Sequence, residues 1–222
     1  MKKNTALLSA LLFVLTLTVS GLARAQDYLV EIVLFENLDP GNDAPYSGKL
    51  YYPMTGNAIG INSPAAVSAG FRSAAGSAGM NAIVGRLNSS GRYRVIDQLA
   101  WQQPGLAAAE ARAIRLSYGS PMTVYVPADA VAEDGLITAL QPGVIDSSID
   151  LKPVSTHQLD GTVTISLGKY LHIDANLVML NETGTDSARL RQHRRMRSKE
   201  IHYLDNPRFG LLVLITPVGN GA

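Results

Sequence analysis

The chain has 222 residues, with 19 Lys and Arg against 18 Asp and Glu, and it contains no Cys. The absence of Cys excludes disulfide bonds, Cys-ligated metal centres and a lipid attached to Cys. The near-balance of charge argues against binding nucleic acid or another polyanion through overall charge, so any basic site must be local.

The first 25 residues have the pattern of a secretory signal peptide. Lys2 and Lys3 precede an apolar run, Ala6–Val19, and Ala23-Arg24-Ala25 has the small-residue spacing of a cleavage site. The run is about 14 residues long, short of the roughly 20 needed to span a bilayer. We therefore expect residues 1–25 to be removed after export.

The remaining residues, 26–222, are expected to form one core or two small ones, and the absence of Cys together with a short signal peptide favours the bacterial periplasm. Removing Lys2, Lys3 and Arg24 from the 19 basic residues leaves 16 against the 18 acidic residues. A chain of this length can bury a core without disulfides or metals. No later segment resembles a transmembrane helix, so no membrane span is expected after cleavage.

The N-terminal half of the mature chain contains two predicted strands and one predicted helix. Tyr28–Glu36 is β-branched and apolar on both faces, which is typical of a covered strand. Gly41–Gly79 is rich in Gly, Ala and Ser and predicts a long loop. Apolar residues at helical spacing then predict a helix over 78–88 with Ser77 as its N-cap, and Tyr93–Trp101 follows as a strand.

The middle of the chain, from 106 to 159, carries weak signals. Ala107–Ala113 favours a helix because of its Ala content. Met122–Val126 lies between two prolines and favours an edge strand.

Regular alternation returns over Thr162–Leu177, with apolar side chains at odd positions and polar ones at even positions. Because the parity continues through Gly168, this stretch is either one long bent strand or a hairpin with a three-residue loop at 168–170. Gly210–Thr216 is apolar on both faces, so we expect a central strand with Leu212–Ile215 almost fully buried. These elements predict an α+β fold, a mainly antiparallel β-sheet with one or more helices on one face, its inner face, and a long Gly/Ala/Ser-rich loop.

A row of basic residues is the most informative feature for function. Every odd position from 189 to 199 is cationic or His: Arg189, Arg191, His193, Arg195, Arg197 and Lys199. Side chains alternate along a strand, so these residues share one face, and parity places them beside Tyr170, His172, Asp174 and Asn176. One register sets His193 opposite Asp174. This surface is either a binding face for an anionic or carbohydrate-like polymer or an acidic protein, or a solvated outer face balanced by acids in the loops.

Two smaller features also have alternative interpretations. His202 and Tyr203 belong either to a recognition loop or to a structured turn fixed by Pro207. Trp101, the only Trp, either stacks on a sugar or closes the core at a strand end.

Catalysis has little support in the sequence. The four His residues show no metal-ligand spacing, and no G-x-S-x-G, S-x-x-K, H-E-x-x-H or P-loop motif is present. We therefore expect no enzymatic activity, no catalytic residues, no cofactor and no bound metal.

Four segments of the chain match the pattern of a known protein family. The most specific is RRMRSKEIHYLDNPRFGLLVLITP (Arg194–Pro217), a basic run followed by HY-x-D-x-P and a hydrophobic strand ending in Ile-x-Pro. The others are YLVEIVLFEN (Tyr28–Asn37), YRVIDQLAWQQPG (Tyr93–Gly105) and LDGTVTISLGKYLHIDANL (Leu159–Leu177). In these segments the chain resembles the CsiV family of periplasmic peptidoglycan-binding proteins. The family pattern often has Arg where this chain has Lys169, and a second His where it has Asn206.

The resemblance implies that residues 26–222 form a single domain in the periplasm of a Gram-negative bacterium, and that this domain binds peptidoglycan and is not an enzyme. It also implies support of cell-wall synthesis, with an outer-membrane lipoprotein that activates a class A penicillin-binding protein as partner. Alternatives are a periplasmic protein-interaction module without direct wall binding and, less favoured, a wall hydrolase. The basic row, the residues predicted beside it and the candidate recognition loop together give the expected ligand-binding residues: Arg191, Arg195, Arg197, Tyr170, His172, His202 and Tyr203. Arg is suited to the carboxylates of peptide stems, which it binds in bidentate fashion.

Overall fold

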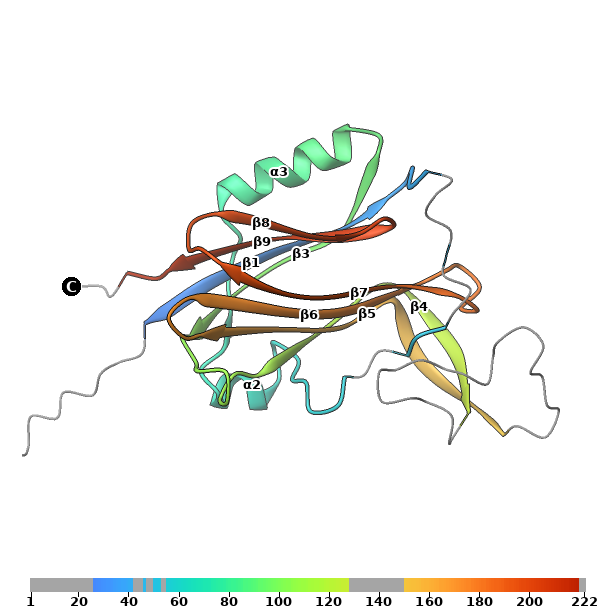
Figure 1. Ribbon diagram of the computed structural model, residues 1–222, viewed down its shortest axis with the longest axis horizontal. Coiled ribbons are helices and arrows are strands. Elements are labelled where there is room, and N and C mark those ends of the chain that lie inside the picture. Colours follow the sequence, from blue (N-terminus) through green and yellow to red (C-terminus); the bar gives the residue numbers. More distant parts are fainter. Residues whose placement is uncertain (1–25, 42–45, 47–49, 53–54, 128–149, 220–222) are drawn as a thin grey trace, which may run out of the picture.

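The computed structural model describes residues 26–41, 46, 50–52, 55–127 and 150–219, and these form two antiparallel sheets packed face to face (Figure 1). The five-stranded sheet has the order β2-β3-β1-β9-β8, and the four-stranded sheet has the order β4-β5-β6-β7. The first comprises β1 (Asp27–Asn37), β2 (Arg72–Ser73), β3 (Tyr93–Pro104), β8 (Ile201–Asn206) and β9 (Phe209–Pro217). The second comprises β4 (Ala113–Pro127), β5 (Leu151–Leu167), β6 (Leu171–Leu180) and β7 (Ser187–Met196).

The main core lies between the two sheets. The five-stranded sheet contributes alternate apolar residues, including Val30, Ile32, Leu34, Trp101, Leu204, Leu211, Val213 and Ile215. The four-stranded sheet contributes Ile114, Leu116, Leu159, Val163, Ile165, Ile173, Leu177 and Leu190. Trp101 is buried, and its indole N–H donates to Gln103 Oε1 at 2.9 Å, so it closes the core rather than presenting a sugar-stacking surface.

The position predicted for the helix was wrong. The predicted inner face of the sheet is covered by a second sheet, and α3 (Ala78–Ser89) lies on the outer face of the five-stranded sheet, against β3 and β1 (Figure 1). The Ser77 side chain caps it, as expected, by accepting from Met80 N at 3.3 Å. Glu31, buried under the helix, accepts from the Ser77 N–H at 2.5 Å, which places a carboxylate at the positive end of the helix dipole.

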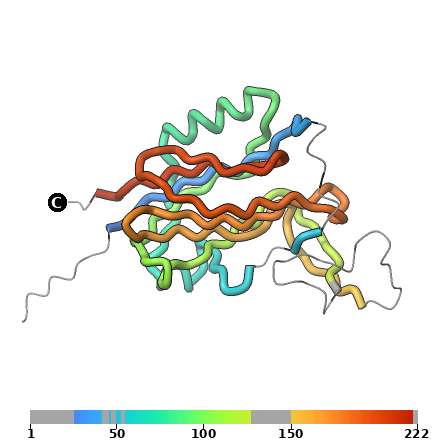
Figure 2. The backbone as a smooth tube through the Cα atoms, in the orientation of Figure 1, coloured from blue at the N-terminus to red at the C-terminus, as the bar shows by residue number. Residues whose placement is uncertain are grey.

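The C-terminal strands confirm one of the two predicted arrangements. Leu167 pairs with Leu171, so residues 168–170 form a three-residue hairpin loop between β5 and β6. Figure 2 follows the chain through β5, β6 and β7 and then across to β8 in the other sheet. β9 lies between β1 and β8, and Val213 is fully buried within it. Leu212, on the opposite face, is only partly buried, so the expected near-complete burial of both faces of this strand was wrong.

The middle of the chain differs most from expectation. Ala107–Ala113 is not a helix: a turn at 108–110 leads into β4, whose edge position includes Met122–Val126. Within the predicted loop over 41–79, the described residues include the short helix α2 (Pro64–Ser68), β2 and a parallel bridge from Ile59 to Ile114. A continuous long loop is therefore not confirmed.

Two further expectations concern the signal peptide and membrane-spanning helices. The predicted signal peptide, residues 1–25, lies outside the described residues. Among the helices that the structure describes, none has the length and apolar character to span a bilayer.

Candidate functional site

The outer face of β6 and β7 carries the polar residues that the alternating pattern predicts. The antiparallel register pairs His172 with Arg195, Asp174 with His193 and Asn176 with Arg191, and so confirms the predicted His193–Asp174 pair. The intervening residues Ile173, Ala175 and Leu177 are buried in the core. We call this surface, with Thr162 and Thr164 of β5, the basic face.

A shallow groove of about 530 Å³ runs across the basic face. It is lined by residues of three adjacent strands: Thr162, Thr164, Asp174, Ala175, Asn176, Arg191, Gln192 and His193. Guanidinium, hydroxyl, amide and imidazole groups therefore meet in one open depression that suits a polar ligand.

Arg191 and Arg195 supply the uncompensated charge of this face. Both side chains are exposed, and neither forms an ion pair with an acidic side chain among the described residues. The Arg195 guanidinium lies over the Tyr170 ring, 4.6 Å from its centroid, and Lys169 Nζ lies 5.7 Å from the same centroid. This stacking positions Arg195 without neutralising it.

His172, His193 and Asp174 form a hydrogen-bonded chain beside the arginines. His193 Nδ1 lies 2.7 Å from Asp174 Oδ1, and His172 Nδ1 lies 3.2 Å from His193 Nε2. With neutral rings, His193 donates to the carboxylate and accepts from His172, which fixes both tautomers. The acidic residue in the groove lining is thereby held by His193 rather than by an arginine.

Arg189 and Arg197, toward the two ends of the basic row, already have partners within the protein. Arg189 is partly buried, with its Nε donating to Asn176 Oδ1 at 3.3 Å and its guanidinium 4.9 Å from the Tyr51 ring centroid. At the other end β7 stops at Met196, so Arg197 and Lys199 lie beyond the strand, and the prediction that the whole row shares one strand face was wrong for these two residues. Arg197 Nη1 lies 3.6 Å from Glu200 Oε1. The available charge is therefore centred on Arg191 and Arg195.

His202 and Tyr203 do not join the basic face. They belong to strand β8, so the expected recognition loop or turn is instead a strand, and the turn is Pro207-Arg208. His202 Nε2 accepts from the Arg197 backbone N–H at 3.0 Å. Tyr203 stacks on Phe35 with ring centroids 5.9 Å apart, on the outer face of the other sheet. Burial, with the nearby Asp205 carboxylate, raises the pKa of Tyr203 to about 12.

A comparison with known protein families shows which family the chain belongs to. The model of a family described as "Peptidoglycan-binding protein, CsiV" matches residues 6–218. The chain belongs to the CsiV family. No curated protein and no solved structure gives a significant match. The matched range includes both sheets and every residue of the basic face in this CsiV family member.

Sequence reasoning missed a second polar cluster in this CsiV protein. Ser117 Oγ lies 2.9 Å from His157 Nδ1, and Arg115 donates to both carboxylate oxygens of Asp160 at 3.1 and 2.6 Å. Ser117 and His157 are 40 residues apart, in the part of the chain with weak signals, so no local spacing indicates their contact. Elsewhere in the described ranges, as here, no three His, Asp or Glu side chains form a group that could hold a metal ion.

Proposed function

We propose that the protein is a non-enzymatic periplasmic peptidoglycan-binding protein that supports cell-wall synthesis. Membership of the CsiV family supports this function, because the family is described as peptidoglycan-binding. The observation that carries the proposal at residue level is the pair of exposed arginines, Arg191 and Arg195, which have no carboxylate partner among the described residues. We propose that they bind carboxylates of the peptide stems.

The chemistry of the groove matches such a ligand. A guanidinium can bind a carboxylate through two parallel hydrogen bonds. Arg191 and Arg195 are four residues apart on one strand, which corresponds to roughly 13 Å. That separation suits two carboxylates along a polymer better than one small anion. Thr162, Thr164 and Asn176 add hydroxyl and amide groups for the peptide backbone.

Exposed ion pairs of this kind are individually weak, about 0–1 kcal/mol each. A polymer that repeats the same carboxylates compensates through multivalency, because a second contact forms at high effective concentration. Binding should therefore be strong to intact sacculi and much weaker to a single stem peptide. It should also fall with added salt, which screens exposed charges over roughly 8–10 Å.

Export and partnership complete the proposal. Residues 1–25 act as a signal peptide, and the mature domain begins at Gln26, which mass spectrometry of the periplasmic protein can test. A retained Met1 would exclude this processing.

The partner that we propose is an outer-membrane lipoprotein that activates a class A penicillin-binding protein. Arg197, His172 and Tyr170 contribute to the wall-binding surface at its edge.

Co-sedimentation with purified sacculi tests the proposed site. The double variant Arg191→Glu with Arg195→Glu should stay folded by circular dichroism and lose most of its binding. A matched control reverses two exposed arginines of the five-stranded sheet and its helix, Arg72→Glu on β2 with Arg86→Glu on α3, and should bind like wild type. Equal binding by both double variants would mean that the basic face is a solvated surface. Release of soluble muropeptides would instead indicate a hydrolase.

A protein-interaction module is the second candidate function, because one apolar surface is uncovered. Ile201 and Tyr203 on β8 are 48% and 44% exposed, and Leu212 and Leu214 of β9 beside them are partly exposed. The helix α3 packs on β3 and β1 of the same sheet. Loss of co-purification with the lipoprotein in Ile201→Ser with Tyr203→Ser, together with unchanged sedimentation with sacculi, would assign partner binding to this surface.

A further inference from the structure

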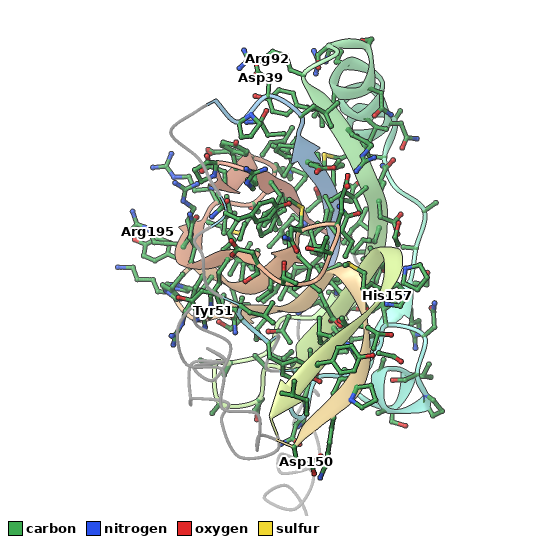
Figure 3. The ribbon with its side chains drawn as sticks, turned by 90° about the vertical axis from the view of Figure 1, so that its right-hand side faces the viewer. Asp39, Tyr51, Arg92, Asp150, His157 and Arg195 are labelled. Carbon is green, nitrogen blue, oxygen red and sulfur yellow. The ribbon has the colours of Figure 1, made fainter. Side chains whose placement is uncertain are left out.

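A second and larger open pocket lies at the β4 edge of the four-stranded sheet, away from Arg191 and Arg195. Its volume is about 720 Å³, within the range of about 300–1,000 Å³ typical of small-ligand sites. It forms where β4 bulges between Tyr118 and Pro121, with Gly119 at φ +83°, beside residues 60–63. In Figure 3, His157 of this pocket and Arg195 of the basic face lie on opposite sides of the molecule.

The charge inside this pocket is already compensated. Arg115 donates two hydrogen bonds to Asp160, whose side chain is almost fully buried. The same carboxylate accepts from Thr156 Oγ1 and from the Gly161 N–H, both at 2.8 Å. Arg115, the one guanidinium among the described residues that line the pocket, is therefore committed to an internal carboxylate and is not free to bind an anionic ligand.

The remaining side chains that line the pocket supply many hydrogen-bond donors and acceptors. It includes the hydroxyl and amide side chains of Asn62, Ser63, Ser117, Thr123 and Ser155. His157 Nδ1 is engaged by Ser117, so its Nε2 is the ring nitrogen available to a ligand. Burial raises the pKa of Tyr118, so its phenol is a neutral donor at physiological pH.

Apolar groups also line this pocket, beside the polar ones. Pro121 and Met122 line one side of the pocket, and Tyr118 presents an aromatic ring. A saccharide has this same mixture of hydroxyl groups and C–H faces. An acetamido substituent adds a methyl group for the apolar side and an amide for the hydroxyl groups.

We propose that this pocket binds the N-acetylated amino sugars of a neutral glycan strand. The choice of sugar rests on the proposed peptidoglycan binding. The pocket would then bind the glycan of the polymer, and the basic face would bind its peptide stems. Arg115, which lines the pocket, pairs across β4 and β5 with Thr162, which lines the groove of the basic face. A polymer long enough to reach from the β4 edge to β6 and β7 can therefore bind the pocket through its glycan and the basic face through its peptide carboxylates.

Calorimetric titration with chitotetraose, the uncharged tetramer of N-acetylglucosamine, tests the proposal on the purified protein. We expect saturable binding that is insensitive to salt, because no ion pair is involved. His157→Ala should weaken it about tenfold, the effect of losing one good hydrogen bond. Ser155→Trp should abolish it by filling the pocket from an exposed position, where the larger side chain leaves the core unchanged. The variant Arg191→Glu with Arg195→Glu should bind the tetramer like wild type.

Two results would overturn the inference: no saturable binding by the wild type, or equal affinity in Ser155→Trp. Either one, with sedimentation on sacculi still dependent on Arg191 and Arg195, would remove the sugar pocket and leave the proposed function intact. Tetramer binding that Ser155→Trp abolishes, in a protein that does not sediment with sacculi, would support the pocket and reject the proposed function.

Discussion

Among the described glycines, Gly161 on β5 is the one at which an added side chain would meet the backbone most closely. It faces Leu177 across the β5–β6 pair, and its φ is +151°, a backbone region that essentially only glycine adopts. A Cβ built at this position would lie 2.2 Å from the Asn176 carbonyl oxygen and 2.8 Å from the Leu177 Cα. Both atoms belong to the backbone of β6, so neither can rotate away.

The expected cost of Gly161→Ala follows from these two terms. The strained backbone contributes about 1–3 kcal/mol, and forcing a strand aside in a packed sheet adds about 1–3 kcal/mol. We therefore expect a loss of roughly 2–6 kcal/mol in the free energy of unfolding. For a chain of this size that corresponds to a fall in melting temperature on the order of 10 °C. Because Asn176 lines the groove, binding to sacculi should weaken as well.

Urea and thermal unfolding, followed by the fluorescence of Trp101, measure this effect, because the single Trp is 1% exposed in the core. Gly168→Ala is the matched control: it lies in the β5–β6 loop, and an added Cβ there meets no atom within 4 Å. The control should be nearly neutral. The steric argument would be refuted if the free energy of unfolding of Gly161→Ala were within about 1 kcal/mol of that of the control. Either term alone, at its upper end, would produce a larger difference.

Three further predictions concern stability. Asp160→Ala should lower the free energy of unfolding by about 2–4 kcal/mol in urea, since it leaves buried donors unpaired, although Arg115, 42% exposed, recovers some hydration. No change on this substitution would mean that the ion pair is dispensable. Because the pKa of Tyr203 rises from 10.0 unfolded to about 12 folded, its stabilisation is complete below pH 10 and is lost between pH 10 and about 12. The urea midpoint of Tyr203→Phe should fall less steeply with pH across that window than the midpoint of the wild type. Identical slopes in the two proteins would contradict the raised pKa of Tyr203. Leu211→Ala, at a fully buried site, should cost about 2–5 kcal/mol, and Leu212→Ala clearly less; equal costs would mean that both faces of β9 are covered alike.

The sequence was most informative where alternation is regular. Apolar residues at odd positions of β6, such as Ile173, and basic residues at odd positions of β7, such as Arg191, determined which side chains share a face. Pairing through a short turn then brought the polar residues together. The helix α3 was also predictable, because Ser77 is an N-cap residue and Met80 begins the apolar spacing.

The layer arrangement was not predictable from the same patterns. Alternation identifies an apolar face but does not say whether a helix or another sheet covers it. Residues 113–121 of β4 and 151–161 of β5 were missed, although Met122–Val126 and the alternation from Thr162 were predicted as strand. Gly119-Ser120-Pro121 resembles a turn but forms a bulge within β4, and Pro153 lies within β5, where a proline argues against a strand. The contact between Ser117 and His157 depends on that bulge and so had no signal in the sequence.

Tyr203 shows a further limit of sequence reasoning. Its neighbours in the chain suggested a loop, because Pro207 follows closely. In the structure a two-residue turn at 207–208 suffices, and residues 201–206 pair with β9 as an edge strand. The alternation of β8 therefore points Tyr203 to the sheet face opposite its core residue Leu204, away from the basic face.

The central claim is that Arg191 and Arg195 bind carboxylates of the wall. The most direct test is sedimentation of the wild-type protein with sacculi before and after their stem carboxylates are converted to amides with carbodiimide and ammonia. Amidation removes the charge that a guanidinium recognises and leaves the glycan unchanged. We predict strong binding to native sacculi and binding to amidated sacculi reduced to the level of the Arg191→Glu, Arg195→Glu variant. Undiminished binding of the wild type to amidated sacculi would contradict the claim.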